Sequence, residues 1–357
     1  MTEEVQEVTV SNLMEYLQEE DQKCRDINCF MGDLGVDDRG RLTVAVDDGF
    51  EVFPINDWAT GQMCSKLGIP KGYYDKCPAH LRSQNVAHWV STDRFMGKSA
   101  FVRLKKQTKY APELDKFGNN VLDDRGNPVM KADGIEERCR GILTDKYSTL
   151  QNARMVEMVH DALWKEYRED VKIDQFWDDD LSFHMRVLFP NLKDHVRTAE
   201  DQMIGGLHFG NSEVGFRRVT VDLLVWRQVC SNGLIGLRSG ESWFSEKHMG
   251  KSEVDLRHAI LNVVRESADQ VRSMFGNLKD LASSDAIPEK DLDQAIEVVG
   301  KGLKKDFLEI VKTEVVREGD FTQYGLLNAF TASARTLRGD DRLFVEQTVA
   351  HRMLRAA

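Results

Sequence analysis

Arginine and aromatic residues alternate through residues 208–244, HFGNSEVGFRRVTVDLLVWRQVCSNGLIGLRSGESWF. The aromatic residues are Phe209, Phe216, Trp226, Trp243 and Phe244, and the arginines are Arg217, Arg218, Arg227 and Arg238. Bases of single-stranded nucleic acid stack on such rings, at about 1–3 kcal/mol per base, while guanidinium groups bind the phosphates. We therefore predict a nucleic-acid-binding surface here. The alternative is a packed core, with Trp226 and Phe216 buried and Arg227 paired with Asp222 or Glu213.

A basic window precedes this stretch. Residues 61–110 carry a formal charge of +8, whereas residues 1–60 carry −11 and residues 61–357 together carry 0. Arg103, Lys105, Lys106 and Lys109 lie in one short run. Such a run attracts phosphates within a Debye length of about 8–10 Å. We predict that it binds the nucleic-acid backbone, although lysines also commonly protect a solvated strand edge.

Two polar turns interrupt the apolar segments of the same stretch. One contains Asn211, Ser212, Glu213 and Gly215, and the other contains Cys230, Ser231, Asn232 and Gly233. Either turn could simply close a hairpin, because Asn-Gly favours tight turns. If the two turns lie on neighbouring strands, however, they place polar side chains at one rim of a sheet, and we take this rim as a candidate site.

Other chemistries find less support in the residue spacing. The Gly-Lys-Ser sequences at 97–99 and 250–252 lack the leading glycine of a phosphate-binding loop, since Thr92 and Ser245 stand there. Cys139 or Cys230 could act as a nucleophile only beside a histidine placed by the fold. A metal-assisted hydrolase could use Glu213, His208 and the run Asp178–Asp180, near His184, but the histidines show no HExxH or HxH spacing. We predict no metal and no cofactor.

The pattern of apolar residues predicts the elements that carry these groups. A short helix is expected over residues 9–20, with Ser11 as its N-cap, followed by a hairpin around residues 37–40 and helices between residues 57 and 84. Strands are expected at 85–91 and 98–110, and a hairpin arm or mobile loop at about 105–140. A helix follows Asn152, further strands follow it, and long helices begin near Ser252 and at Pro288.

These elements predict an α+β fold, with an antiparallel β-rich body and packed helices, followed by a C-terminal all-helical region. We expect the body to span residues 1–250, including the acidic N-terminal segment 1–60, and the helical region to span 251–357. The first residues are acidic and no run of about 18 apolar residues occurs, so we expect no membrane contact and a cytoplasmic location. The six scattered cysteines favour reduced thiols.

Three segments together resemble one family: LGIPKGYYDKCPAHL, RGILTDKYSTLQNARMVEMV and FGNSEVGFRRVTVDLLVWRQVCSNGLI. They are similar to the phage/plasmid-like proteins grouped as domain of unknown function 932, over roughly residues 55–270. The residues that carry this resemblance are Tyr147, Asn152, Asn211, Ser212, Glu213, Gly215, Arg227, Cys230, Asn232 and Gly233. The resemblance implies a phage or plasmid setting, and thus the cytoplasm of a host cell, but no mechanism.

The leading hypothesis is a DNA-metabolism protein that binds single-stranded DNA as a homo-oligomer and promotes annealing or recombination without ATP. Its contact residues would be Arg103, Lys105, Lys106, Lys109, Arg217, Arg218, Arg227, Arg238, Phe216 and Trp243. A second hypothesis is a host-takeover or anti-defence factor that binds a host protein through its acidic N-terminus. The third is the metal-assisted hydrolase described above.

Overall fold

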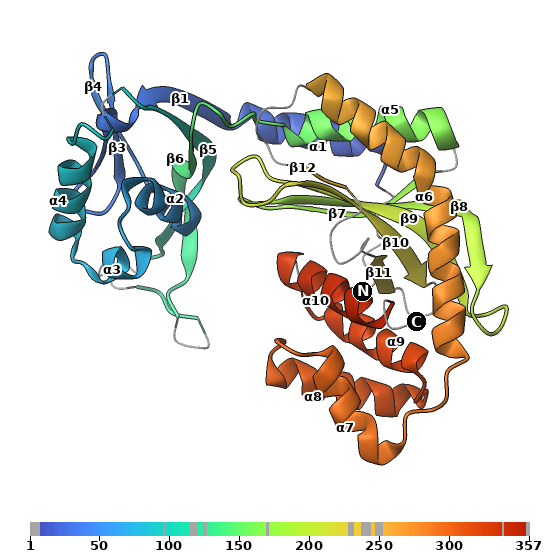
Figure 1. The fold of residues 1–357 in the computed structure, drawn as a ribbon. Helices are drawn as coiled ribbons and strands as arrows, with labels where there is room; N and C mark the ends of the chain where they lie inside the picture. Colours follow the sequence, from blue (N-terminus) through green and yellow to red (C-terminus); the bar gives the residue numbers. More distant parts are fainter. Residues whose placement is uncertain are drawn as a thin grey trace. The chain divides into compact units, whose positions relative to one another are not determined.

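The computed structural model describes residues 8–95, 97–114, 120–123, 127–168, 171–227, 232–236, 244–246, 253–337 and 339–354. These residues fall into two compact units (Figure 1). The small unit comprises Tyr16–Thr149 and Val214–Phe216. The large unit comprises the described residues up to Glu15, those of Leu150–Glu213 and those from Arg217 onward. This division does not coincide with the boundary near residue 250 that the sequence suggested.

The described residues of the small unit form two antiparallel sheets and three complete helices, besides the second half of the first helix. One sheet has the order β1-β5-β6, formed by Cys24–Phe30, Ser99–Pro112 and Met130–Leu143. The other is β2-β3-β4, formed by Leu34–Val36, Leu42–Val46 and Gly49–Phe53, with a 3-10 turn η1 (Met31–Asp33) before it. The helices are α2 (Asp57–Leu67), α3 (Lys71–Lys76) and α4 (Ala79–Val90). All of them contribute to one apolar core, which contains Leu42, Val44, Met63, Leu67 and Val102.

The large unit is built on an antiparallel sheet of order β11-β10-β9-β8-β7, with β12 beside β10. The strands are β7 (Lys172–Asp178), β8 (Phe183–His195), β9 (Gln202–Asn211), β10 (Val219–Arg227), β11 (Asn232–Gly236) and β12 (Phe244–Glu246). Helices α5 (Asn152–Tyr167) and α6 (Glu253–Ala282) lie on one face (Figure 1). On the other face lie α9 (Gln323–Ala334) and α10 (Gly339–Met353), with α7 (Glu289–Val299) and α8 (Lys305–Glu318) beyond them. Helix α1 (Val10–Gln22) crosses the boundary between the units.

The two faces of the large sheet differ in chemistry because neighbouring strand residues point to opposite sides. The face under α5 and α6 is apolar and includes Met185, Val187, Leu207 and Phe209, all buried. The face under α10 is polar at one end, where His184, Arg186, His208 and Asp222 are fully buried. Its other end is apolar, where Leu188, Leu224 and Leu343 pack with Ile204 and Trp226.

The fold class predicted from the sequence, α+β with helices in the C-terminal part, is confirmed. The helix start predicted at Pro288 is confirmed to within one residue, since Pro288 is the N-cap of α7. Two local predictions were wrong. Ser11 lies inside α1, and the hydroxyl of Thr9 instead accepts the Asn12 N–H at 3.2 Å. The segment 85–91 is not a strand but belongs almost entirely to α4.

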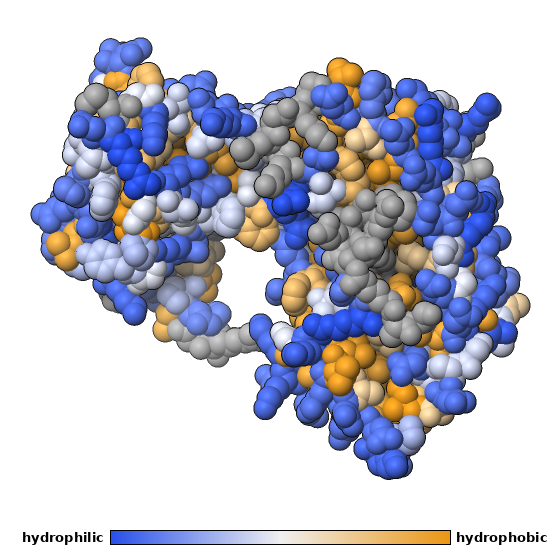
Figure 2. Space-filling model, viewed as in Figure 1, coloured by the Kyte–Doolittle hydropathy of each residue, from blue (hydrophilic) through white to orange (hydrophobic). Residues whose placement is uncertain are grey.

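No helix among the described residues is long and apolar enough to cross a membrane. Figure 2 shows that hydrophilic residues predominate on the visible face of each unit.

Candidate functional site

The basic run on β5 lies beside acidic residues of the N-terminal segment. Strand β1 pairs with β5, with Asp26 opposite Arg103. The Arg103 side chain is fully buried, and its Nε lies 3.5 Å from the Asp26 carboxylate. Lys105 Nζ lies 2.8 Å from Glu20. The prediction that Arg103 binds phosphate was therefore wrong, and the opposite charges of the two segments partly neutralise each other within the small unit.

The acidic N-terminal segment is engaged in further internal ion pairs. Arg25 bridges Glu51 and Glu137, at 2.6 and 2.7 Å. Lys71 Nζ contacts Asp57 at 2.6 Å. These pairs leave the segment with less free negative charge for an external partner than its composition suggested.

The arginines near β10 contact other parts of the large unit. Arg217 forms an ion pair with Asp340 of α10. Arg227 pairs with Asp201, at 2.5 Å, and it also lies over the Tyr324 ring. Arg218 is exposed to solvent. Internal pairing of Arg217 and Arg227 opposes their predicted role as phosphate contacts.

The aromatic rings that were predicted to stack on bases do not lie together with the arginines either. Phe216 packs edge-on against Trp58, with ring centroids 5.0 Å apart, in the small unit. Arg238 and Trp243 lie outside the described residues. Since the β5 cations and Phe216 belong to the small unit and Arg217, Arg218 and Arg227 to the large unit, the described residues do not gather on one surface of either unit.

Three of the family-motif residues come together in the large unit. The Asn152 backbone N–H donates to Glu213 Oε1 at 2.9 Å, and Asn211 Nδ2 donates to Asn152 Oδ1 at 2.7 Å. Asn211 Nδ2 also donates to the carbonyl of Leu150 at 2.9 Å. These buried hydrogen bonds fix the start of α5 to the end of β9, so the residues position the backbone.

The turn that follows them is held within the small unit. Both Trp58 Nε1 and Gln62 Nε2 donate to the Val214 carbonyl, at 3.0 and 2.8 Å. Gly215 has φ of +74°, and a Cβ there would meet Leu143 and Tyr147 at 3.3 and 3.4 Å. A glycine is therefore required. Ser212, which belongs to the large unit, is buried.

The two polar turns do not share a rim of the sheet. Residues 211–215 precede β10, whereas residues 228–231 follow it, because Arg227 at the end of β10 pairs with Asn232 at the start of β11. The described members Asn211 and Asn232 therefore lie beside opposite ends of β10, which contradicts the predicted shared rim. Cys230 and Ser231 lie outside the described residues, and Gly233 belongs to β11.

The geometry does not support the hydrolase. Among the described residues, no group of three or more histidine, cysteine, aspartate or glutamate side chains could hold a metal ion. Asp179 instead accepts the backbone N–H groups of Leu181 and Ser182, both at 2.8 Å, and Asp178 accepts from Asn152. Burial raises the pKa of the Cys139 thiol to about 12, which opposes its use as a nucleophile.

The sequence did not reveal a chain of four polar side chains that runs from Asp340 of α10 to three fully buried residues of the sheet. Asp340 Oδ1 lies 3.0 Å from His184 Nε2, and His184 Nδ1 lies 3.0 Å from His208 Nε2. His208 Nδ1 lies 3.3 Å from Asp222 Oδ2. We call these four residues the histidine chain. The sequence does show isolated polar residues within otherwise apolar strands. Such a residue can be recognised as buried only when the pairing of the strands is known.

A buried ion pair lies next to the histidine chain. Arg186 of β8 contacts Glu346 of α10 at 2.5 Å, and both side chains are at most 1% exposed. Arg342 also contacts Glu346, at 2.8 Å. Burial lowers the pKa of Arg186, and the Glu346 charge opposes that effect. Charge pairing thus joins α10 to the sheet where an apolar interface would be usual.

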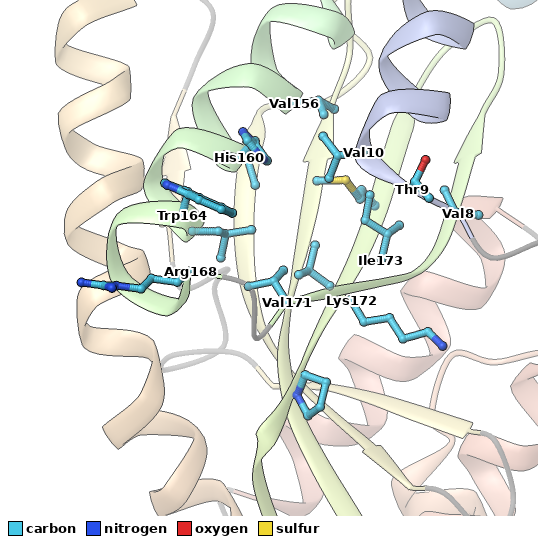
Figure 3. A pocket seen from close by; sticks show the side chains of 15 residues that line it. Val8, Thr9, Val10, Val156, His160, Trp164, Arg168, Val171, Lys172 and Ile173 are labelled. Carbon is cyan, nitrogen blue, oxygen red and sulfur yellow. The ribbon is translucent and has the colours of Figure 1, made fainter.

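On the opposite face of the sheet lies an apolar groove of about 470 Å³. Figure 3 shows Val10, Val156 and Ile173 within it and the Trp164 ring turned toward it, whereas Arg168 and Lys172 extend outward. Its size matches small-molecule sites.

The outer half of β5 and β6 exposes several large apolar side chains. The strands pair from Phe101 with Leu143 to Pro112 with Met130. Beyond Lys105 they form a two-stranded ribbon, which we call the arm (Figure 1). Tyr110, Met130 and Ile135 on the arm are 60%, 51% and 77% exposed.

The two faces of the arm differ. Paired residues lie on the same face of a ribbon, as do residues two apart in one strand. Thr108, Tyr110 and Pro112 therefore share one face with their partners Ile135, Ala132 and Met130, because the register shift between Thr108 and Tyr110 keeps Ile135 and Ala132 on the same side; Lys106 and its partner Glu137 lie at the base of this face. Lys109 lies on the other face, where its Nζ contacts Asp133 at 2.9 Å. Gln107 also lies there and contacts Glu136 at 3.0 Å. The arm is thus amphipathic, with its apolar face in solvent.

Comparison of the chain with protein-family models, curated proteins and solved structures gave no match, so the resemblance drawn from the sequence stays a prediction.

Proposed function

We propose that this protein is a binding protein that assembles into homo-oligomers through the apolar face of its arm. The observation that carries the proposal is the exposure of Tyr110, Met130 and Ile135 on one side of a paired ribbon. Exposed apolar surface on an ordered element is typical of interaction sites. A single ribbon has no core of its own, so covering this face with another sheet stabilises it.

A second copy of the chain is the occupant that fits best. In a two-fold interface the same patch meets itself, so an apolar strip buries an identical apolar strip. The charged face of the arm would stay in water, and its Lys109–Asp133 pair limits repulsion between two copies. We propose this face as the contact surface of the homo-oligomer that the sequence analysis predicts.

Replacing Ile135 by lysine is expected to weaken self-association at least tenfold, because a charge would be buried between two apolar strips. Sedimentation or mass photometry over a range of protein concentrations measures this. The matched control is Gln107→Lys, which adds the same charge to the opposite face, next to Glu136. A wild-type chain that stays monomeric, or an Ile135→Lys variant that associates like wild type, contradicts the proposal.

Single-stranded DNA binding is a second candidate, and three exposed lysines on the arm favour it: Lys106, Lys109 and Lys131. Lys106 and Lys109 belong to the basic window of residues 61–110, whereas Lys131 lies on the partner strand β6. Affinity for phosphates falls with rising salt in proportion to the number of contacts, with a slope of about 0.7 per contact for single strands.

Changing all three lysines to glutamine is expected to remove about two units from that slope and to weaken binding at low salt. Fluorescence anisotropy of a labelled oligonucleotide measures both effects. The control changes Lys301, Lys304 and Lys305, which are exposed near the start of α8 in the large unit. Absent binding at low salt, or equal losses in both triple variants, would exclude the arm as the DNA contact.

A further inference from the structure

The number of protons in the histidine chain follows from its geometry. Three contacts link Asp340, His184, His208 and Asp222 in a row, and each of them needs one proton between its two heavy atoms. Two neutral imidazoles carry only two N–H protons between them. One contact would then place two lone pairs against each other. The chain therefore holds one proton more than two neutral histidines and two ionised carboxylates supply.

The extra proton has three possible positions: an imidazolium, Asp340 or Asp222. Burial lowers the pKa of His184 to about 3 and that of His208 well below its ordinary value, so an imidazolium is disfavoured. Although burial opposes it, the His184 hydrogen bond and the Arg217 charge lower the pKa of Asp340. Asp340 therefore accepts from His184 Nε2–H, and His184 Nδ1 accepts from His208 Nε2–H. His208 Nδ1 is then a lone pair facing Asp222.

We infer that Asp222 is a neutral carboxylic acid that donates to His208 Nδ1, and that docking of α10 on the sheet takes up this proton. The surroundings agree with a closed site. Gln347 of α10 reaches Asp222 Oδ2 at 3.1 Å, and the Trp177 ring of β7 stacks on His184 at 4.6 Å. Among the described residues, the charged groups outside the chain that act on His208 are Arg186 of β8 and Arg217 before β10, and Asp179, which follows β7, acts on Arg217.

This proton makes α10 docking weaken as pH rises. When α10 leaves, Asp222 meets water and ionises, because its ordinary pKa is about 3.9. The docked state then holds one proton more than the undocked state at neutral pH, so each pH unit costs a factor of ten in the docking constant. The two histidines contribute a pH dependence of the opposite sign. Their lowered pKa values stabilise the docked state above about pH 6.5, and this contribution is lost as the pH falls below that value.

Asp222→Asn isolates the effect, because the amide Nδ2–H can donate to His208 Nδ1 without titrating. Urea unfolding of the full chain at about pH 6.5, 7.5 and 8.5 gives the folding constant of each protein. The ratio of wild type to Asp222→Asn is expected to fall about tenfold per pH unit, since the histidine contributions cancel. In the matched control Asp341→Asn, which changes an exposed carboxylate of α10, the ratio to wild type should stay constant. A constant ratio for Asp222→Asn would overturn the inference.

A second measurement does not depend on any variant. Nitrogen NMR of the histidine-labelled protein is expected to show both His184 and His208 as neutral rings protonated at Nε2. An imidazolium signal, or a ring protonated at Nδ1, from either residue at neutral pH would place the extra proton elsewhere and overturn the assignment to Asp222.

Discussion

Replacing Glu346 by alanine is expected to destabilise the large unit by about 3–5 kcal/mol, because Arg186 would remain fully buried without its partner. Arg342 would lose its contact as well. The loss of free energy reflects an uncompensated charge rather than the strength of the pair. Urea unfolding of the full chain measures it, with hydrogen exchange in α10 showing where the loss is felt.

Two further variants test this explanation. The double variant Arg186→Met with Glu346→Leu removes both charges and should recover most of the lost stability, since apolar replacements of buried pairs are often neutral or stabilising. The control Glu297→Ala, at an exposed position of α7, should change stability by no more than about 0.5 kcal/mol. A loss below about 1 kcal/mol for Glu346→Ala, or no recovery in the double variant, would contradict the explanation.

Replacing Gly206 by alanine is expected to cost about 3 kcal/mol. A Cβ at this position of β9 would lie 2.1 Å from the Val187 carbonyl oxygen and 3.1 Å from the Leu188 Cα. These are backbone atoms of β8, which cannot move aside without disturbing the ladder between the strands, so the added methyl group is overpacked. Thermal and urea unfolding of the variant measure the loss.

Gly276→Ala is the matched control, because the same methyl group is added where nothing lies within 4 Å. Gly276 lies inside α6, where alanine is the better helix former by about 0.8–1.0 kcal/mol. The two substitutions should therefore change stability in opposite directions. A Gly206→Ala variant as stable as wild type would mean that β8 and β9 do not approach as closely as described.

The fold class could be predicted because local patterns specify it. The long apolar stripe of α6 and the proline before α7 are signals carried by neighbouring residues. The wrong prediction of a strand over residues 85–91 also came from local patterns. Its apolar residues suit a strand by type, but buried Val86 and partly buried Trp89 and Val90 have helical spacing, and they continue a helix that begins after Pro78.

The candidate sites depended on pairings that the sequence does not show. The charge of residues 61–110 looked available because the acidic partners Glu20 and Asp26 lie about eighty residues earlier and meet β5 only through β1. The histidine chain likewise joins β8, β9 and β10 to α10. Contacts between distant segments follow from sheet order, which composition and spacing leave open.

The polar end of the sheet face under α10 has a consequence for synthesis on the ribosome. Strands β7–β10 leave the ribosome more than a hundred residues before α10. The sheet face that α10 later covers is therefore exposed while the intervening segment is translated. Exposed apolar sheets invite aggregation at this stage. The imidazole, guanidinium and carboxyl groups of this end can be hydrated until the helix arrives, so the nascent chain presents a less adhesive surface there.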